Sequence, residues 1–253
     1  MLAIERKLKI AEIINRNGGI KTSDLSHLFN VSEMTILRDL LSLEQEGVLK
    51  RVYGGAVKVN SSTNEISANI RKHTNTIQKN IIAEKALKLI SVGESIFLDS
   101  STTALALAKK ISEKQLEITI VTNNFEIINE LKENINIKII CPGGELQKST
   151  LSFIGPNSER FLKEYFADKS FISALGLSLK AGITVENPVQ AALKKVMISN
   201  SLQKVVLIDS SKFDKTSLSK VCDFKDIDIV VTDKKPQDCY LKYFKKIGIE
   251  LIY

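Results

Sequence analysis

Residues 22–57 place two amphipathic stretches, a turn between them and a glycine pair in one continuous run of the chain. The run reads TSDLSHLFNVSEMTILRDLLSLEQEGVLKRVYGGAV. A short helix that holds a longer helix at a fixed angle is the arrangement with which a helix-turn-helix enters the DNA major groove. This segment constrains the fold more than any other, and it predicts a DNA-binding domain over residues 1–59.

The first two helices of this domain follow from apolar spacing. Leu8, Ala11 and Ile14 predict a helix over about residues 3–16, ended by the glycines at 18 and 19. Thr22 is expected to cap a second, shorter helix with its side-chain oxygen. The residues expected to form the buried stripe of that helix are Leu25, Leu28 and Phe29. Asn30 then suits a turn, and Val31 can fill the gap between the helices.

A third helix is expected from about residue 33 to 46, with Ser32 as its cap and Gly47 as its end. At 100° per residue, one face carries the apolar side chains Ile36, Leu40 and Leu43, which should pack inward. The opposite, outward face carries Met34, Arg38, Ser42 and Gln45, with Thr35 beside them.

Arg38 is the main candidate for reading DNA, since it lies in the first half of the third helix, the part that meets base edges. Its planar guanidinium can grip guanine or a phosphate through two hydrogen bonds. The alternative is an ordinary solvated arginine paired with Asp39 or Ser42.

Residues 48–59, VLKRVYGGAVKV, predict a β-hairpin around a Gly-Gly turn. After a helix-turn-helix such a hairpin is a wing, whose basic residues can reach phosphates or the minor groove. The alternative is a structural hairpin with solvated basic residues. The candidate DNA-contacting residues are Thr22, Ser23, Ser32, Met34, Thr35, Arg38, Ser42, Lys50, Arg51 and Tyr53.

Charge gives only weak support for a nucleic-acid partner. The whole chain has a formal net charge of +7. Residues 1–57, however, hold eight Lys and Arg against seven Asp and Glu, a net charge of +1. Affinity for DNA must therefore come from where the cations point, or from dimerisation, and not from bulk charge.

The run VSEMTILRDLLSLEQEGVLKRVYGGAV resembles the DNA-binding signature of the DeoR family of bacterial transcriptional regulators. That signature has V-S, then T-[IV]-R-R-D-L, then L-x-x-x-G and a basic wing that ends G-G-A. The matching residues are Thr35, Ile36, Arg38, Asp39, Leu40, Leu43, Gly47, Arg51, Gly54, Gly55 and Ala56. The first of the two usual arginines is Leu37 here, which removes a cation and five donors from the expected surface.

Residues 60–76 are interpreted as a linker that includes a possible connecting helix, and residues 77–253 as a second domain. In that domain short β-rich runs alternate with helical stretches, which predicts a mainly parallel sheet flanked by helices. The expected strands are SIFLD, EITIVT, IKIIC, SFISALGL, KVVLIDS, DIDIVVTD and IELIY. The expected fold class is thus α/β, with an N-terminal winged helix-turn-helix.

Polar residues cluster where these strands end, and open α/β sheets bind ligands at the carboxyl ends of their strands. Hydroxyls and backbone amides at a helix start can also hold a phosphate. The alternative for each residue is an ordinary helix cap. The candidates at strand ends are Asp99, Ser100, Ser101, Thr102, Thr103, Thr122, Asn123, Asn124, Gly143, Gly144, Asp209, Ser210, Ser211 and Lys212.

The second domain also resembles the DeoR-type sensor domain, which is similar in fold to ribose-5-phosphate isomerase and CoA transferases. DSSTTALALA, IVTNN, PGGEL, SFIGP, the stretch from Gly176 to Gly182 and IDSSKF follow in the family's order. The resemblance implies a phosphorylated sugar as effector, and it adds Lys194 to the ligand candidates. Gln190 and Ala192 stand where glutamates are common, so the contacts to ligand hydroxyls are expected to differ.

Other chemistry finds little support. The three cysteines are far apart in the sequence. Cys141 is interpreted as a buried or idle reduced thiol, and a redox sensor is the less favoured alternative. His27 and His73 are too distant to form a metal site. The sequence has no nucleophile elbow, Walker loop or G-x-G-x-x-G and no membrane-length apolar run. The stretch MLAIERKLKI, which carries Glu5 and has no apolar core of secretory length, is not expected to be a signal peptide. We expect a cytoplasmic protein without metal, cofactor or catalytic residues.

The resulting hypothesis is a regulator, in the first place a repressor of carbohydrate genes, that binds a double-stranded DNA operator as a homo-oligomer, dimer or tetramer. We expect Arg38→Ala to weaken operator binding and Asp99→Ala to blunt the effector response. One rival is a sugar-phosphate isomerase or transferase with an accessory winged helix, using Asp99, Asp209 or Lys212 as acid or base. The other is an adaptor whose winged helix binds protein.

Overall fold

The structure is a computed structural model that describes residues 3–45, 48–58, 68–114 and 116–253. Contacts within the chain divide it into two compact units, of which the first ends at Thr74 and the second begins at Asn75. Each unit is described below by itself. The boundary expected after residue 59 and the first part of the expected linker, 60–67, lie outside the described residues.

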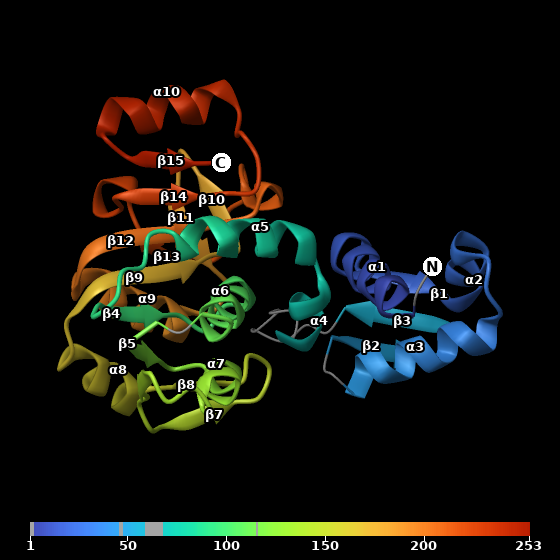
Figure 1. Cartoon of the computed structure of the whole chain (residues 1–253). Coiled ribbons are helices and arrows are strands. Elements are labelled where there is room, and N and C mark those ends of the chain that lie inside the picture. Colours follow the sequence, from blue (N-terminus) through green and yellow to red (C-terminus); the bar gives the residue numbers. More distant parts are fainter. Residues whose placement is uncertain (1–2, 46–47, 59–67, 115) are drawn as a thin grey trace. The chain divides into compact units, whose positions relative to one another are not determined.

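The first unit is a helical domain completed by a small sheet (Figure 1). Its strands form an antiparallel sheet in the order β1-β3-β2. The expected three helices and the hairpin are all confirmed, while β1 was not predicted. The elements are α1 (Ala3–Asn17), β1 (Gly19–Lys21), α2 (Thr22–Phe29), α3 (Glu33–Gln45), β2 (Leu49–Val52), β3 (Gly55–Lys58) and α4 (Ala68–His73).

Helices α1, α2 and α3 pack through their apolar faces, as the spacing predicted. The buried core of the unit consists of Ile10, Ile14, Leu25, Ile36, Leu40, Leu43, Leu49 and Ala56. Two predictions for α2 were wrong. Leu28 is 60% exposed and lies outside the buried stripe. Thr22 is the first residue of α2 and not its cap, a position held by Lys21 without a side-chain hydrogen bond.

The hairpin turn differs from the expected Gly-Gly turn. Val52 pairs with Gly55, so the two turn residues are Tyr53 and Gly54. Gly54 has φ +74°, a left-handed conformation that glycine adopts without strain. Gly55 belongs to β3, where an added Cβ would lie 2.4 Å from the carbonyl oxygen of Ile20. The second glycine therefore serves the close approach of β1 to β3.

The second unit is built on a seven-stranded sheet in the order β15-β14-β12-β9-β4-β5-β6. Figure 1 shows this order from β15 to β5. Every neighbouring pair in it is parallel. All seven β-rich runs predicted from the sequence contribute a strand, so the expected parallel α/β fold is confirmed. The strands are β4 (Ser95–Leu98), β5 (Ile118–Thr122), β6 (Ile137–Ile140), β9 (Ala167–Ser173), β12 (Ser201–Leu207), β14 (Ile229–Val231) and β15 (Glu250–Ile252).

Helices cover both faces of this sheet because the strands are apolar on both faces. In β4, Ile96 and Leu98 join the core beneath α5, α6 and α7, while Phe97 joins the core beneath α8 and α9. Helix α10 covers the same face as α9, over β12 and β14. The helices are α5 (Thr76–Leu87), α6 (Thr102–Ser112), α7 (Phe125–Leu131), α8 (Pro156–Lys163), α9 (Pro188–Ser199) and α10 (Asp238–Ile247).

The strand order creates a switch point between β4 and β9. From β4 the chain adds β5 and β6 on one side, and then β9, β12, β14 and β15 on the other. Crevices at such points are where open α/β sheets bind ligands. Two further sheets were not predicted. They comprise β7 (Glu145–Gln147) with β8 (Ser152–Ile154), and β10 (Gly176–Ser178) with β11 (Gly182–Val185) and β13 (Ser219–Cys222).

Candidate DNA-reading face and effector site

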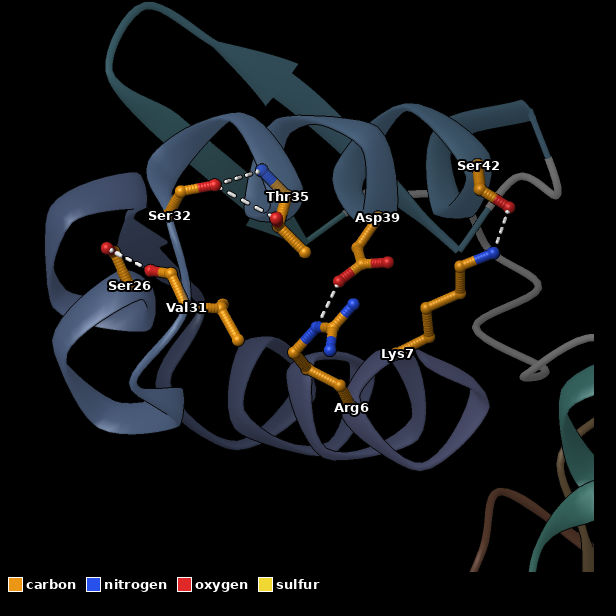
Figure 2. Close-up of polar contacts among 8 residues, drawn as sticks. All are labelled: Arg6, Lys7, Ser26, Val31, Ser32, Thr35, Asp39 and Ser42. Carbon is orange, nitrogen blue, oxygen red and sulfur yellow. Dashed lines mark hydrogen bonds and ion pairs between the residues drawn. The ribbon is translucent and has the colours of Figure 1, made fainter. Parts of the chain in front are cut away.

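The turn between α2 and α3 is fixed by short polar contacts, shown in Figure 2. Asn30 adopts a left-handed conformation with φ 50°, which ends α2, as expected for a turn residue. The Ser26 hydroxyl donates to the carbonyl oxygen of Val31 at 2.6 Å. Ser32 Oγ accepts from the backbone N–H of Thr35 at 3.2 Å, which confirms Ser32 as the cap of α3.

Two contacts hold α3 against α1 (Figure 2). Arg6 Nε donates to Asp39 Oδ2 at 2.5 Å, and both side chains are buried. One turn further along α3, Lys7 Nζ donates to Ser42 Oγ at 2.7 Å. Ser42 is therefore only half-exposed and faces α1, not the outward surface expected for it. Asp39 has a structural role that the sequence pattern did not reveal.

These contacts engage the two residues that were expected to pair with Arg38. Its two expected partners, Asp39 and Ser42, are occupied by Arg6 and Lys7. Arg38 is exposed, and among the described residues nothing accepts a hydrogen bond from it or pairs with it. Met34, four residues earlier, is 60% exposed on the same side of α3. The guanidinium is thus open to an external acceptor.

The hairpin adds further exposed groups. Lys50, Arg51 and Val52 of β2 are exposed, and Tyr53 at the turn is fully exposed. Glu44 of α3 fixes this strand, because it accepts from the Arg51 backbone N–H at 2.7 Å and lies 4.0 Å from Arg51 Nε. The wing and α3 are thereby joined into one surface.

The remaining DNA candidates are less exposed. Thr22 is buried, and its hydroxyl has no hydrogen-bond partner among the described residues. Ser23 and Thr35 are half-buried, and Ser32 is exposed. The hydroxyls of Ser32 and Thr35 lie 2.9 Å apart and satisfy each other in part. The exposed face thus centres on Arg38, Met34 and the wing.

At the switch point of the second unit, Asp99 forms a buried cluster with Lys194 from α9. The Lys194 ammonium donates to Asp99 Oδ2 although the two residues are far apart in sequence. The same oxygen accepts from the Ser173 backbone N–H at 2.7 Å, and Asp99 Oδ1 accepts from Ser101 N at 3.0 Å. Ser173 ends β9 and was missed by sequence reasoning, because strand order is not encoded in periodicity.

Lys194 has donors to spare. An ammonium carries three N–H donors. Within the described part of the chain no acceptor other than Asp99 contacts Lys194, although the side chain is buried, with 5% of it exposed. A buried cation held from one side is suited to bind an anionic group from the other.

The residues after Asp99 are buried and mostly structural in their visible contacts. Ser101 caps α6, since its hydroxyl oxygen accepts from Ala104 N at 3.0 Å. Thr102 and Thr103 occupy the first turn of α6, where backbone N–H groups have no partner within the helix. Ser100 lies beside them and is also buried. This is an amide-rich helix start next to Lys194.

The two asparagines that follow β5, Asn123 and Asn124, make different contacts. Asn124 is an ordinary cap of α7, because its Oδ1 accepts from Glu126 N at 2.7 Å and Ile127 N at 3.1 Å. Thr122 Oγ1 accepts from Asn124 N at 3.1 Å. Asn123 differs, as its Nδ2 donates to the Phe153 carbonyl at 3.0 Å, whereas its buried Oδ1 has no partner among the described residues.

The predicted glycines introduce the β7–β8 hairpin. At Gly144 an added Cβ would lie 2.4 Å from Ser158 Oγ, and the Ser158 hydroxyl donates to the Gly143 carbonyl at 2.8 Å. The hairpin contacts α9 at Gln147, whose Oε1 accepts from Gln190 Nε2 at 2.9 Å. The glycines therefore shape this hairpin.

The end of β12 forms a separate polar group. Asp209 caps a short 3-10 helix (Ser210–Lys212), and its Oδ1 accepts from Ser211 N at 3.0 Å and Asn75 Nδ2 at 3.2 Å. Ser210 is engaged by Asp233, which accepts from its backbone N–H at 2.6 Å. Lys212 is half-buried at the end of this helix.

Other reactive groups give no second site within the described residues. No cluster of His, Cys, Asp and Glu there could hold a metal ion. Cys141 and Cys239 are exposed, and burial raises the pKa of the Cys222 thiol to about 12, which disfavours its reactive thiolate. None of the helices in the described ranges combines the length and the apolar character that a membrane span requires.

An exposed arginine on α3, a basic wing and a separate α/β unit with a polar switch point are typical of a ligand-responsive DNA-binding regulator. Comparison with known families agrees. The DeoR-like helix-turn-helix domain matches residues 6–63, and the DeoR C-terminal sensor domain matches residues 74–234.

Relatives cover nearly the whole chain. It is 41% identical to the HTH-type transcriptional regulator YulB of Bacillus subtilis (strain 168), over 92% of this chain and 90% of that protein. It is 34% identical to the lactose phosphotransferase system repressor of Staphylococcus epidermidis, over 90% of this chain and 91% of that protein. The chain therefore belongs to the DeoR family of transcriptional regulators.

Among solved structures, the fold is similar to ribose 5-phosphate isomerase A from Methanocaldococcus jannaschii. The TM-score is 0.42 and the identity 21%, over 55% of each chain.

Proposed function

We propose that this regulator represses genes of carbohydrate use, and that a phosphorylated sugar bound in the second unit controls its affinity for DNA. The observation that carries the first half is the exposed guanidinium of Arg38 on the outward side of α3, which has no partner among the described residues. An exposed helix face with an unpaired cation, next to a basic wing, suits the major groove and its flanking phosphates. The staphylococcal relative, a lactose phosphotransferase system repressor, supports a role in a carbohydrate system.

In the proposed complex, Arg38 and Met34 face base edges, while Ser32, Thr35 and the wing residues Lys50, Arg51 and Tyr53 position the duplex. Ser23 lies at the start of α2, where a hydroxyl and backbone amides can meet a phosphate. Ser42 and Thr22 support this face from behind, since Ser42 binds Lys7 and Thr22 is buried.

The effector is proposed to bind at the switch point between β4 and β9. Its phosphate would accept hydrogen bonds from the spare donors of Lys194 and from the amides at the start of α6, around Thr102 and Thr103. A hydroxyl of the sugar would donate to Asn123 Oδ1, which is buried without a partner in the described part of the protein. Asp99 would orient Lys194 and is not itself expected to contact the ligand.

Control of DNA binding is proposed to be a population shift. A ligand that favours one arrangement of protomers changes whether two recognition helices match the spacing of two half-sites. This mechanism requires a homo-oligomer, a dimer or a tetramer, in the cytoplasm where the chromosome lies. It requires no turnover, so the protein should leave pentose and hexose phosphates unchanged in an isomerase or transferase assay.

Thermal-shift measurements test the effector site. Pentose and hexose phosphates are compared with the same sugars lacking phosphate and with inorganic phosphate. We expect at least one phosphorylated sugar to stabilise the protein, by roughly 2–3 kcal/mol at a hundredfold excess over its Kd, and to change the affinity for operator DNA. The unphosphorylated sugar should do neither.

The matched variant is Lys194→Met combined with Asp99→Asn, because it keeps the length of both side chains, removes the cation and leaves no charge buried without its partner. It should lose the stabilisation by the sugar phosphate and retain operator binding. Stabilisation that is equal for the sugar and its phosphate, or equal in the variant, would contradict the proposed phosphate contact.

A further inference from the structure

Three large apolar side chains lie exposed along one strip of α3. Met34 is 60% exposed, Leu37 37% and Leu41 43%. Residues three and four apart are neighbours on a helix surface, so the three side chains adjoin one another. Single exposed apolar residues are common on protein surfaces. A continuous strip beside an exposed arginine is a different feature, and a partner that buries the strip would gain free energy.

The position of the strip follows from its neighbours. Arg38 lies beside Met34, one turn along the same side of α3. Leu37 and Leu41 lie on the side that leads to Glu44, which binds Arg51 of the wing. Arg6 and Lys7 hold the opposite side of α3 against α1. Leu37 is therefore placed between the reading arginine and the wing, inside the surface proposed to meet DNA.

The chemistry of the major groove determines what a leucine can recognise there. Every base pair presents hydrogen-bond donors and acceptors in this groove, but only thymine presents an apolar group, its C5-methyl. A leucine side chain has neither donor nor acceptor, so it can gain free energy only from that methyl. Leu37 is in the first half of α3, the half that meets base edges, whereas Leu41 lies one turn further along.

We propose that Leu37, packed beside Met34, reads the methyl group of a thymine in the operator and thereby sets the sequence specificity at that base pair. The inference rests on the proposed function, in which this face of α3 enters the major groove. Charge favours DNA over a protein as the partner of the strip, because the exposed cations Arg38 of α3 and Lys50 and Arg51 of the wing belong to the same surface as the strip, which Glu44 joins to the wing.

The test begins with the full chain and a library of random duplexes, from which binding sequences are enriched. Leu37→Ala, Leu37→Arg and Leu41→Ala go through the same enrichment. Leu41→Ala is the matched control, since it removes the same side chain at similar exposure from the same side of α3. Deoxyuridine then replaces thymidine, position by position, in the enriched duplex, which removes a single methyl group each time.

The wild type should enrich a thymine that Leu37→Ala no longer selects, and Leu37→Arg should shift that position to guanine, which arginine binds through two hydrogen bonds. Deoxyuridine at that position should weaken wild-type binding about fourfold, the effect of one buried methyl group. The same replacement should leave the affinity of Leu37→Ala unchanged, and the affinity of Leu41→Ala should fall as in the wild type.

Three results would overturn the inference while leaving the proposed function intact. The first is a wild type that binds enriched duplexes tightly and tolerates deoxyuridine everywhere. The second is a fourfold loss that persists in Leu37→Ala. A change of oligomeric state in Leu37→Ala, seen by sedimentation, would assign the strip to a second copy of the chain and overturn it as well. Failure of the wild type to enrich any duplex would overturn the proposed function itself.

Discussion

The outer face of α3 and the polar strand ends of the second unit were predicted with the same kind of reasoning, yet the structure places their residues in opposite situations. On α3, Arg38 is exposed and unpaired within the described residues. At the strand ends, Asp99 is buried and accepts from three donors. An exposed, unpaired group can be changed at little cost to stability, whereas a buried, paired group supports both the fold and the proposed site.

The largest effect is expected from Asp99→Ala. The change leaves the Lys194 ammonium buried without its partner, and the loss of one member of a buried ion pair costs roughly 3–5 kcal/mol. Urea unfolding of the variant measures this loss. Replacement of both members, Asp99→Asn with Lys194→Met, should recover a large part of the stability. A loss below about 1 kcal/mol in the single variant would show that the pair contributes little.

Asp39→Ala should have a similar but local effect in the first unit. The change leaves the buried Arg6 guanidinium without its partner and removes a contact between α3 and α1. We expect it to lower the free energy of unfolding by roughly 3 kcal/mol. Hydrogen exchange of the α3 amides measures the effect. The neighbouring Arg38→Ala is the control, and its stability should stay within about 0.5 kcal/mol of the wild type. Equal losses in the two variants would mean that Arg38 is also structural.

A smaller effect is expected from Asn124→Ala. Asn124 caps α7, and the loss of a cap costs about 1 kcal/mol. Thermal unfolding with and without a sugar phosphate that stabilises the wild type measures both roles. Because the cap accounts for the contacts of Asn124, the variant should unfold earlier and keep the full ligand-induced stabilisation. Loss of that stabilisation would place Asn124 in the effector site.

The smallest effect is expected from Thr22→Val. The Thr22 hydroxyl is buried without a partner among the described residues, so its replacement by a methyl should leave stability unchanged or raise it by up to about 1 kcal/mol. Operator affinity should stay within about twofold. Unfolding and DNA titrations check the two quantities. A tenfold weaker complex of Thr22→Val with operator DNA, at unchanged protein stability, would instead indicate that Thr22 contacts DNA.

Local patterns in the sequence predicted most of the fold. Helical spacing located α1, α2 and α3, and β-rich runs located all seven strands of the parallel sheet. The pattern missed β1, whose three residues are too few to show a period and whose pairing needs Gly55 from a distant hairpin. The α2 errors have a related cause, because only the packing of α2 decides which of its apolar residues face inward.

The candidate site was predictable as a set of positions but not as a set of contacts. Strand ends were recognisable, but the order that brings β4 next to β9 was not, so Ser173 was missed. The contacts of Arg6 with Asp39 and of Lys194 with Asp99 join residues far apart in the chain. Such contacts separate capping residues such as Asn124 from candidates such as Asn123, whose side-chain oxygen has no hydrogen-bond partner among the described residues.

The central claim is that the exposed side of α3 reads a DNA duplex, and one paired affinity measurement tests it most directly. Arg38→Ala and Lys9→Ala each remove one exposed cation from the first unit, Lys9 from α1. Both are titrated at one salt concentration against the duplex that the wild type enriches. Arg38→Ala should lose at least about tenfold in affinity, as expected for a specific contact, and Lys9→Ala no more than about threefold. Equal losses, or full affinity in Arg38→Ala, would contradict the account.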